Sequence, residues 1–357
     1  MRNGKTTHTS TERILVFDLE DGLRIPIIGA PMAGGPSTPE LVAAVSSAGG
    51  LGFLAAGYKT VDAVRREVDA VRALTSAPFG LNLFVPGRPL ADRAAVEAYR
   101  ARLQRLAEHW QVSLPEVVDF DDDAFDAKVG LAVELAVPVV SFTFGLPPRD
   151  VVDRLHDAGS AVVATVSDVD EACSAAGVGV DAIGLQGVDA GGHRATLDPG
   201  AEPDPRSTRE LVEAARSAID LPIIAAGGIA TAADVAAALA AGATAVQIGT
   251  ALLDADEAGT KPAHRAALHD ARFTDTVVTR AFSGRPARGL VNDFITDFDA
   301  HAVAAYPQVH LLTSGLRAAA GAAGDPHGLA LWAGTGYRSA RSAPAGEIVR
   351  DLWSETR

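Results

Sequence analysis

The sequence predicts an α/β fold, a closed (β/α)8 barrel of the TIM type with a small, mainly helical cap. Eight short apolar runs alternate with Ala-rich helical stretches from residue 25 onward. The runs lack the alternation of apolar and polar residues found in strands with one solvated face, which is typical of parallel strands covered on both faces. An open doubly wound sheet is the structural alternative. Eight regular units favour closure into a barrel, whose usual size is about 250 residues.

The expected strands are the apolar runs that are followed by a Gly/Pro turn or a polar residue. They cover residues 25–30, 51–55, 79–84, 137–142, 161–166, 182–186, 222–226 and 245–248. The helical stretches between them include residues 39–48, 61–74, 151–158, 170–176, 209–219 and 232–240.

Two segments do not follow the alternation of strands and helices expected for the barrel. The segment after the third expected strand is too long for one connection and holds a charged helix over 91–110 and an acidic patch. The C-terminal segment holds helical pieces and two loops rich in Gly and Arg. We expect the two segments to pack together over one barrel mouth. The predicted division is a barrel from 22–85 and 136–262, a cap from 86–135 and 263–357, and a flexible N-terminus over 1–21.

Composition excludes several classes of protein. Lys and Arg number 31 against 45 Asp and Glu, a net charge of −14, which argues against broad binding of nucleic acids or anionic membranes. Cys173 is the single cysteine, so a cysteine-ligated cluster and an intrachain disulfide are excluded. The N-terminus lacks an apolar signal region and no run reaches the ~18 apolar residues of a membrane span, so we expect a cytoplasmic protein. No cluster has metal-ligand spacing, so no metal is expected.

Glycines follow the seventh and eighth expected strands. Gly227 and Gly228 end the former, and Gly249 and Thr250 the latter, with a helix expected after each. Barrel enzymes place their sites at these strand ends and often bind phosphate there. Glycines let backbone N–H groups approach an anion closely. The alternative for each loop is a tight turn without a ligand, but two such loops together favour phosphate.

His193 is the best candidate for an active group. It follows Gly191 and Gly192 in a loop expected at the barrel mouth. Histidine serves near neutral pH as base, acid or cationic anchor. The alternative is a solvent-exposed loop histidine. Other histidines, among them His8, His109, His264, His301 and His327, have no comparable sequence context.

Polar residues also occur at strand ends and in one cationic loop. Asn82 and Gln186 end apolar strands, where each amide bonds either neighbouring loop backbone or the edge of a heteroaromatic ring. The loop 279–289 suits carboxylate or phosphate recognition, with solvated pairing to surface acids as the alternative. Its arginines are Arg280, Arg285 and Arg288.

Several motifs, in this order, resemble the nitronate monooxygenases, formerly called 2-nitropropane dioxygenases, and the class I enzymes among them. The segment 26–52, with Ala30-Pro31-Met32-Ala33-Gly34-Gly35, resembles the opening motif of that family. Further matching segments are 79–84, 186–194, 221–250, 279–289 and 331–334.

The resemblance implies an FMN-dependent barrel in which His193 is the catalytic histidine. It implies that Pro31 and Met32 pack beside the isoalloxazine ring. The remaining positions that it assigns to the cofactor are Asn82, Gln186, Gly191, Gly227, Gly228, Gln247, Ile248, Gly249 and Thr250.

The implied reaction is the oxidative denitrification of alkyl nitronates to carbonyl compounds and nitrite with O2, with a small anionic nitronate or nitroalkane as substrate.

An FMN-dependent NAD(P)H enoyl-thioester or quinone reductase is the nearest alternative, since such enzymes share the Gly-Gly-His loop. No Gly-x-Gly-x-x-Gly follows a strand, however. An inosine-monophosphate-dehydrogenase-like enzyme needs a loop cysteine, and Cys173 lies in the expected helix 170–176. A flavin-free phosphoester-binding barrel is the alternative from another class. Whether the chain forms a homo-oligomer stays open.

Three positions depart from the family pattern. The family usually has Gln at Gly29, Glu at Asp189 and Gln at Thr335. We expect Gly29 and Thr335 to lie near the pocket and to bear on substrate preference. None of the three is a residue expected to hold FMN.

Overall fold

The computed structural model describes residues 22–356, so the flexible segment predicted over 1–21 lies outside the described residues. Eight parallel strands close into a barrel, with β1 hydrogen-bonded to both β2 and the last strand, β9. Each predicted run overlaps one of these strands, with ends that differ by at most two residues. The strands are β1 (Ile27–Gly29), β2 (Leu51–Ala55), β3 (Gly80–Phe84), β4 (Val139–Thr143), β5 (Ala161–Val166), β6 (Ala182–Gln186), β8 (Ile223–Ala226) and β9 (Ala245–Ile248).

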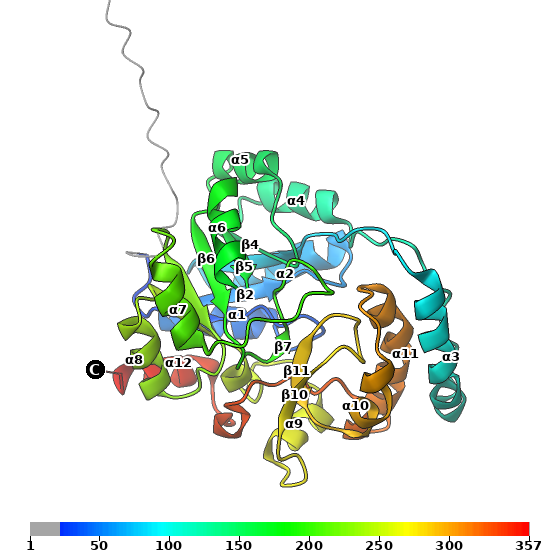
Figure 1. Cartoon of the computed structure of the whole chain (residues 1–357). Helices are drawn as coiled ribbons and strands as arrows, with labels where there is room; N and C mark the ends of the chain where they lie inside the picture. The colour runs from blue at the N-terminus through cyan, green and yellow to red at the C-terminus, as the bar shows by residue number, and fades with distance from the viewer. Residues whose placement is uncertain (1–21, 357) are drawn as a thin grey trace, which may run out of the picture.

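Helices cover the outside of the barrel (Figure 1). Hydroxyl or carboxylate N-caps begin most of them: Thr38 accepts the Leu41 N–H before α1, and Thr231 accepts the Asp234 N–H before α8. Valines spaced four and three apart on α2 form a buried stripe against the strands. The helices that alternate with the strands are α1 (Pro39–Ala48), α2 (Val61–Leu74), α4 (Phe125–Glu134), α5 (Arg149–Asp157), α6 (Val169–Val178), α7 (Thr208–Arg216) and α8 (Ala232–Ala240).

The insertion after β3 and the C-terminal region pack together as a cap. Helix α3 (Arg93–Trp110) lies beside α11 (Gln308–Ala322) in Figure 1, and the two share a buried cluster that includes Tyr99, Leu103 and Leu312. Helices α9 (Pro262–His269) and α10 (Asp293–Phe298) complete the helical part. Residues 86–92 and 111–124 connect α3 to the barrel.

The cap also holds a small sheet that the sequence did not predict. Strands β10 (Thr276–Thr279) and β11 (Ala287–Leu290) form a hairpin, and β11 pairs with the two-residue strand β7 (Gly192–His193) in the loop after β6. The arginine-rich segment predicted as a loop is therefore partly a strand. Through this sheet the cap holds the His193 loop.

Two helices within the ranges assigned to the cap pack on the barrel. Helix α4 contacts α2 and β3, and α12 (Ala345–Ser354) contacts α1 and α8. Side chains of both helices belong to the main hydrophobic core. The division of the chain into barrel and cap ranges stays a prediction. By their contacts, both helices pack with the barrel and not with the cap. No helix between residues 22 and 356 is both long and apolar enough to cross a membrane.

Candidate active site

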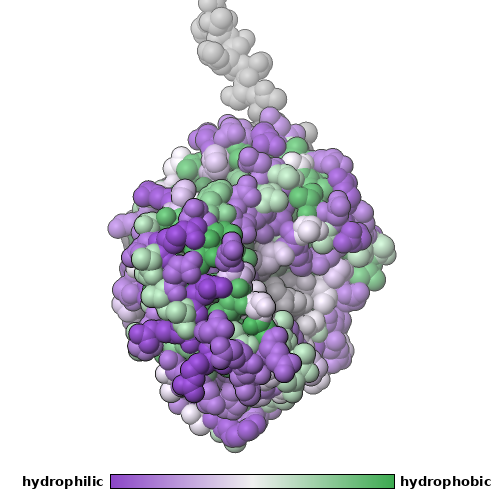
Figure 2. Space-filling view, turned by 90° about the vertical axis from the view of Figure 1, so that its right-hand side faces the viewer, coloured by the Kyte–Doolittle hydropathy of each residue, from purple (hydrophilic) through white to green (hydrophobic). Residues whose placement is uncertain are grey.

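The carboxyl ends of the barrel strands open into one pocket of about 280 Å3. The face of the molecule in Figure 2 is hollowed near its centre, among mostly hydrophilic side chains. The side chain of Ile248 instead joins the core between barrel and helices, with 1% exposed. All the other predicted site residues line the pocket: Pro31, Met32, Asn82, Gln186, Gly191, His193, Gly227, Gly228, Gln247, Gly249 and Thr250.

The loops after β8 and β9 form a backbone cradle. Gly227 and Gly228 have φ of 116° and 70°, the left-handed region that favours glycine. The N–H groups of Gly228, Ile229 and Thr250 have no hydrogen-bond partner among residues 22–356. Helix α8 begins at Ala232, four residues after Gly228, whereas the helix that follows β9 is only the three-residue 3-10 helix η1 (Thr250–Leu252). Free N–H groups ahead of a helix N-terminus suit an anionic group.

The two strand-end amides have different partners. Asn82 Nδ2 donates to the hydroxyls of Ser141 and Thr143, both at 2.9 Å, while its Oδ1 has no partner in the described chain. Gln186 Nε2 donates to the His193 carbonyl at 3.0 Å, and its Oε1 accepts the Ala195 N–H at 2.9 Å. Gln186 therefore takes the first of the two predicted alternatives, since its amide holds the loop that carries His193.

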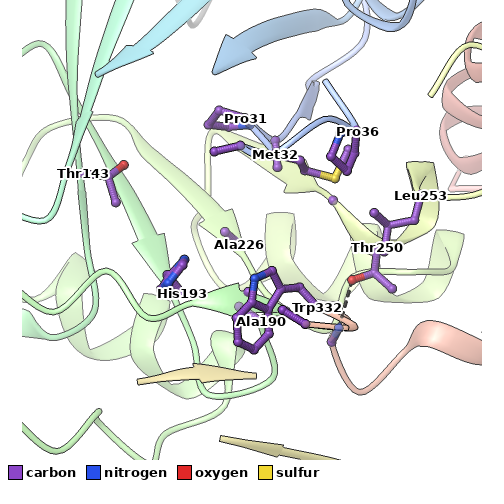
Figure 3. A pocket seen from close by; sticks show the side chains of 18 of the residues that line it. Pro31, Met32, Pro36, Thr143, Ala190, His193, Ala226, Thr250, Leu253 and Trp332 are labelled. Carbon is purple, nitrogen blue, oxygen red and sulfur yellow. Dashed lines mark hydrogen bonds between the residues drawn. The ribbon is translucent and has the colours of Figure 1, made fainter. Parts of the chain in front are cut away.

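His193 reaches the pocket from β7. In Figure 3 it lies on the same side as Ala190 and Trp332, opposite Pro31 and Met32. Its Nε2 is 2.9 Å from Ser283 Oγ. Desolvation and the positive charges of Arg285 and Arg317 lower the pKa of His193 to about 3. The ring is thus neutral at physiological pH, so it has a lone pair that can accept a proton and it is not a cationic anchor.

The three arginines of the predicted cationic loop have different environments, and none of them lines the pocket. Arg280 pairs with Glu202 at 3.1 Å, and Arg288 Nε donates to the Val188 carbonyl at 3.0 Å. Arg285 is 1% exposed and lies 4.2 Å from the Phe144 ring centroid, a cation–π contact. Only Arg280 behaves as the surface alternative expects.

A sequence model of the nitronate monooxygenase family matches residues 19–355. The chain belongs to the nitronate monooxygenase family. A probable nitronate monooxygenase from Staphylococcus aureus (strain N315) is 37% identical over 333 residues, covering 92% of this chain and 94% of the relative. The chain is thus a flavin-type oxidoreductase.

Two solved structures share the fold of this chain but differ in how similar they are to it. The crystal structure of a nitroalkane oxidase from Streptomyces ansochromogenes is 47% identical, with a TM-score of 0.91 over 95% of this chain and 97% of that one. FabK from Thermotoga maritima is 28% identical, with a TM-score of 0.73 over 95% and 94%. Both share the barrel, but the nitroalkane oxidase is far more similar.

Sequence reasoning missed the wall that the cap adds to this family's barrel. Tyr58 stacks on His310, with ring centroids 3.9 Å apart at 6°, and both line the pocket. Tyr58 also hydrogen-bonds its hydroxyl to that of Tyr306 at 2.9 Å. His264 lines the pocket too, so two histidines besides His193 lie at the site. The available signal was the four-residue spacing of Tyr306 and His310 at the start of a helical stretch.

Arg317 adds positive charge to the pocket wall. Its guanidinium donates to His310 Nδ1 at 3.1 Å and to Thr313 Oγ1 at 3.2 Å. No described carboxylate lies within ion-pair distance of it. An unpaired guanidinium at a pocket attracts anions. The described residues hold no group of three or more His, Cys, Asp or Glu side chains that could bind a metal ion.

The three departures from the family pattern alter the pocket wall little. A Cβ on Gly29 would meet Val45 and Leu252 in the helix layer, so this position faces away from the pocket. Thr335 does not line the pocket, although Gly334 and Gly336 on either side of it do. Its Oγ1 lies 3.3 Å from Asp189 Oδ1, so two of the departing residues contact each other.

Proposed function

We propose that the chain is an FMN-dependent nitronate monooxygenase that converts alkyl nitronates and O2 to carbonyl compounds and nitrite. One observation carries the proposal. A single pocket combines a backbone anion cradle, a neutral imidazole and a guanidinium without a carboxylate partner. The cradle suits a cofactor phosphate, and the guanidinium suits a small anionic substrate.

The residues present fit FMN. The free N–H groups of Gly228, Ile229 and Thr250 would hold its phosphate, at a cradle that side chains on Gly227 and Gly228 would fill. The unpartnered Oδ1 of Asn82 would accept a hydrogen bond from the polar edge of the ring system. Met32 and Pro31 would form the wall beside it.

FMN, when bound, supplies the electron acceptor that passes electrons from the nitronate to O2. The chain's own residues bind the substrate and remove its α-proton. Arg317 draws the nitronate anion into the pocket by its unpaired charge. His193, neutral in the free protein, accepts the α-proton when the substrate is a neutral nitroalkane. The aromatic wall of Tyr58, Phe144 and Trp332 excludes water around that proton transfer.

Anaerobic mixing of the purified holoprotein with a primary nitronate such as propyl-1-nitronate tests the proposal. We expect the oxidised flavin bands to bleach within the turnover time, and nitrite to form when air is readmitted. Flavin released by heat should be FMN by mass. A yellow protein that no nitronate bleaches would contradict the proposed reaction, and a colourless one would favour the flavin-free barrel.

A further inference from the structure

Ser283 is held against His193 by one small sheet. It lies in the turn between β10 and β11, with its Oγ 2.9 Å from His193 Nε2. The backbone of His193 pairs with Ala287 of β11, and the next residue, Arg194, donates its N–H to the Pro286 carbonyl at 2.7 Å. Ser283 is 1% exposed, so water does not compete for its hydroxyl. Hydroxyl and imidazole are therefore fixed relative to each other.

The Ser283 hydroxyl has one proton and three polar neighbours. The Arg285 N–H, at 3.4 Å, can only donate to it, and the Arg285 carbonyl, at 3.2 Å, can only accept. No other described donor reaches that carbonyl, and Arg285 is 1% exposed. Buried carbonyls are almost always paired. The arrangement that satisfies every atom sends the hydroxyl proton to the Arg285 carbonyl and makes His193 Nε2–H the donor to Oγ.

This hydrogen-bond pattern determines the tautomer of His193. A neutral imidazole with its proton on Nε2 carries its lone pair on Nδ1. Nδ1 has no hydrogen-bond partner within the described part of the chain, and the ring lines the pocket. The unshared electron pair is therefore on Nδ1, the ring nitrogen that no described group occupies.

We propose that Ser283 is a positioning residue that holds His193 as the Nε2–H tautomer, with Nδ1 as the atom that accepts a proton. The chemistry rests on the proposed function. Nδ1 takes the α-proton of a neutral nitroalkane, the C–H bond breaks, and its electron pair forms the C=N bond of the nitronate. The nitro oxygens take up the negative charge, and His193 becomes an imidazolium. Its Nε2–H keeps the bond to Ser283, because the Arg285 carbonyl still holds the hydroxyl proton.

The tautomer can be measured without turnover. Holoprotein labelled with 15N-histidine gives separate NMR signals for the two ring nitrogens, and His193→Asn identifies those of His193 by their loss. We expect a protonated Nε2 and a bare Nδ1 at pH 7, and a mixture of tautomers in Ser283→Ala. A protonated Nδ1 in the wild type overturns the proposal, as does a Ser283→Ala spectrum identical to the wild type. Neither outcome depends on the substrate.

Turnover gives the second measurement. Ser283→Ala should lower the rate with a neutral nitroalkane by about tenfold or more, since correct proton acceptance is worth ~10²–10⁴. The rate with the preformed nitronate should stay within about threefold, and Ser283→Thr, which keeps the hydroxyl, should restore the nitroalkane rate. Ser160→Ala is the matched control, because Ser160 is equally buried, has an unpartnered hydroxyl and lies outside the pocket.

Parallel loss with both substrates would indicate a damaged hairpin and overturn the positioning role. A wild-type protein inactive with both substrates would instead contradict the proposed function, and the NMR measurement would still decide the tautomer.

Discussion

A Cβ placed on Gly228 would lie 2.8 Å from the Cβ of Asp189, closer than side chains tolerate. The loops after β6 and β8 meet at this point. The C-terminal segment joins them, since the Thr335 N–H donates to the Asp189 carbonyl at 3.1 Å and Thr250 Oγ1 accepts the Gly334 N–H at 2.9 Å (Figure 3). Segments far apart in the sequence thus converge on the cradle.

Gly228→Asp should abolish FMN binding. The substitution puts a carboxylate where the phosphate would sit and forces a side chain against Asp189 at positive φ. Purified protein should be colourless, with flavin content below a tenth of the wild type. Gly324→Asp is the matched control, because Gly324 has nearly the same φ, 71°, with no atom within 4 Å of the added Cβ. It should bear the backbone cost of roughly 1–2 kcal/mol and stay yellow. A yellow, active Gly228→Asp protein would overturn this placement of the phosphate.

The barrel and most of its site could be predicted because their signals are local. Leu51–Ala55 and Ala182–Gln186 are buried runs between turns, and the closed fold brings every strand end to one mouth. Reading the residues after each run therefore found His193 and the cradle glycines without knowledge of tertiary contacts.

The rest of the site depends on pairings between distant segments. Strand β7 has two residues and exists only because β11, nearly a hundred positions later, pairs with it. His310 and Arg317 reach the pocket through the docking of α11 onto α3, which no local pattern specifies. Gln186 lines the pocket, and its amide bonds the backbone of the His193 loop, a partner that no local pattern specifies.

NADH should not reduce the bound flavin at a catalytic rate. The chain lacks a dinucleotide fingerprint after any strand, and the solved nitroalkane oxidase is much more similar to it than FabK is. Rapid mixing under anaerobic conditions with excess NADH should leave the oxidised bands in place for many nitronate turnover times. Fast bleaching by NADH would favour the reductase alternative.

Buried histidines should make the fold sensitive to acid. Burial lowers the pKa of His264 to about 4 and that of His310 well below its usual range. Unfolded imidazoles, with a pKa of about 6.5, bind protons below that pH while the folded ones do not. The stability that comes from keeping these histidines neutral is therefore fully present above about pH 6.5 and decreases as the pH falls toward 4. For His264 the free energy of unfolding falls by at most about 1.4 kcal/mol per pH unit.

His264→Asn should weaken this dependence. We measure the free energy of unfolding with urea between pH 7 and pH 4.5. Its slope against pH should be smaller than in the wild type, by an amount that corresponds to at most one fewer proton taken up on unfolding. His109→Asn, at an exposed position on α3, is the control and should leave the slope unchanged. Equal slopes in all three proteins would show that His264 is protonated in the folded state.

Arg317→Gln should weaken binding of nitronates. A hydrogen bond to a charged group is worth about 1.5–3 kcal/mol, so KM for the nitronate should rise roughly 10–100-fold with little change in kcat. Arg317→Lys, which keeps the charge, should recover part of the loss. Arg280→Gln removes a charge that pairs with Glu202 outside the pocket and should leave KM within twofold. An unchanged KM in Arg317→Gln would show that the substrate anion binds elsewhere.

His193→Asn should separate the two substrate forms. Its flavin content should stay near that of the wild type, because Gln186 holds the loop through the His193 carbonyl and not through its ring. The rate with neutral nitroalkanes should fall by ~10²–10⁴, since His193 is the proposed acceptor of the α-proton. The rate with preformed nitronates should fall much less, because their proton is already gone. His310→Asn is the control, since Arg317 occupies His310 Nδ1, and it should leave the ratio of the two rates unchanged.

The ratio of the rate with neutral nitroalkanes to the rate with preformed nitronates, followed against pH, tests whether His193 acts as a base. Because the pKa of His193 lies near 3 in the free protein, the wild-type ratio should be flat from pH 8 down to pH 5. The positive charge of Arg317 helps to hold that pKa down, so Arg317→Gln should raise it and bring the loss of nitroalkane activity to a higher pH. If both rates in His193→Asn stay within about threefold of the wild type, well short of the ~10² that a base contributes, His193 plays no part in proton transfer.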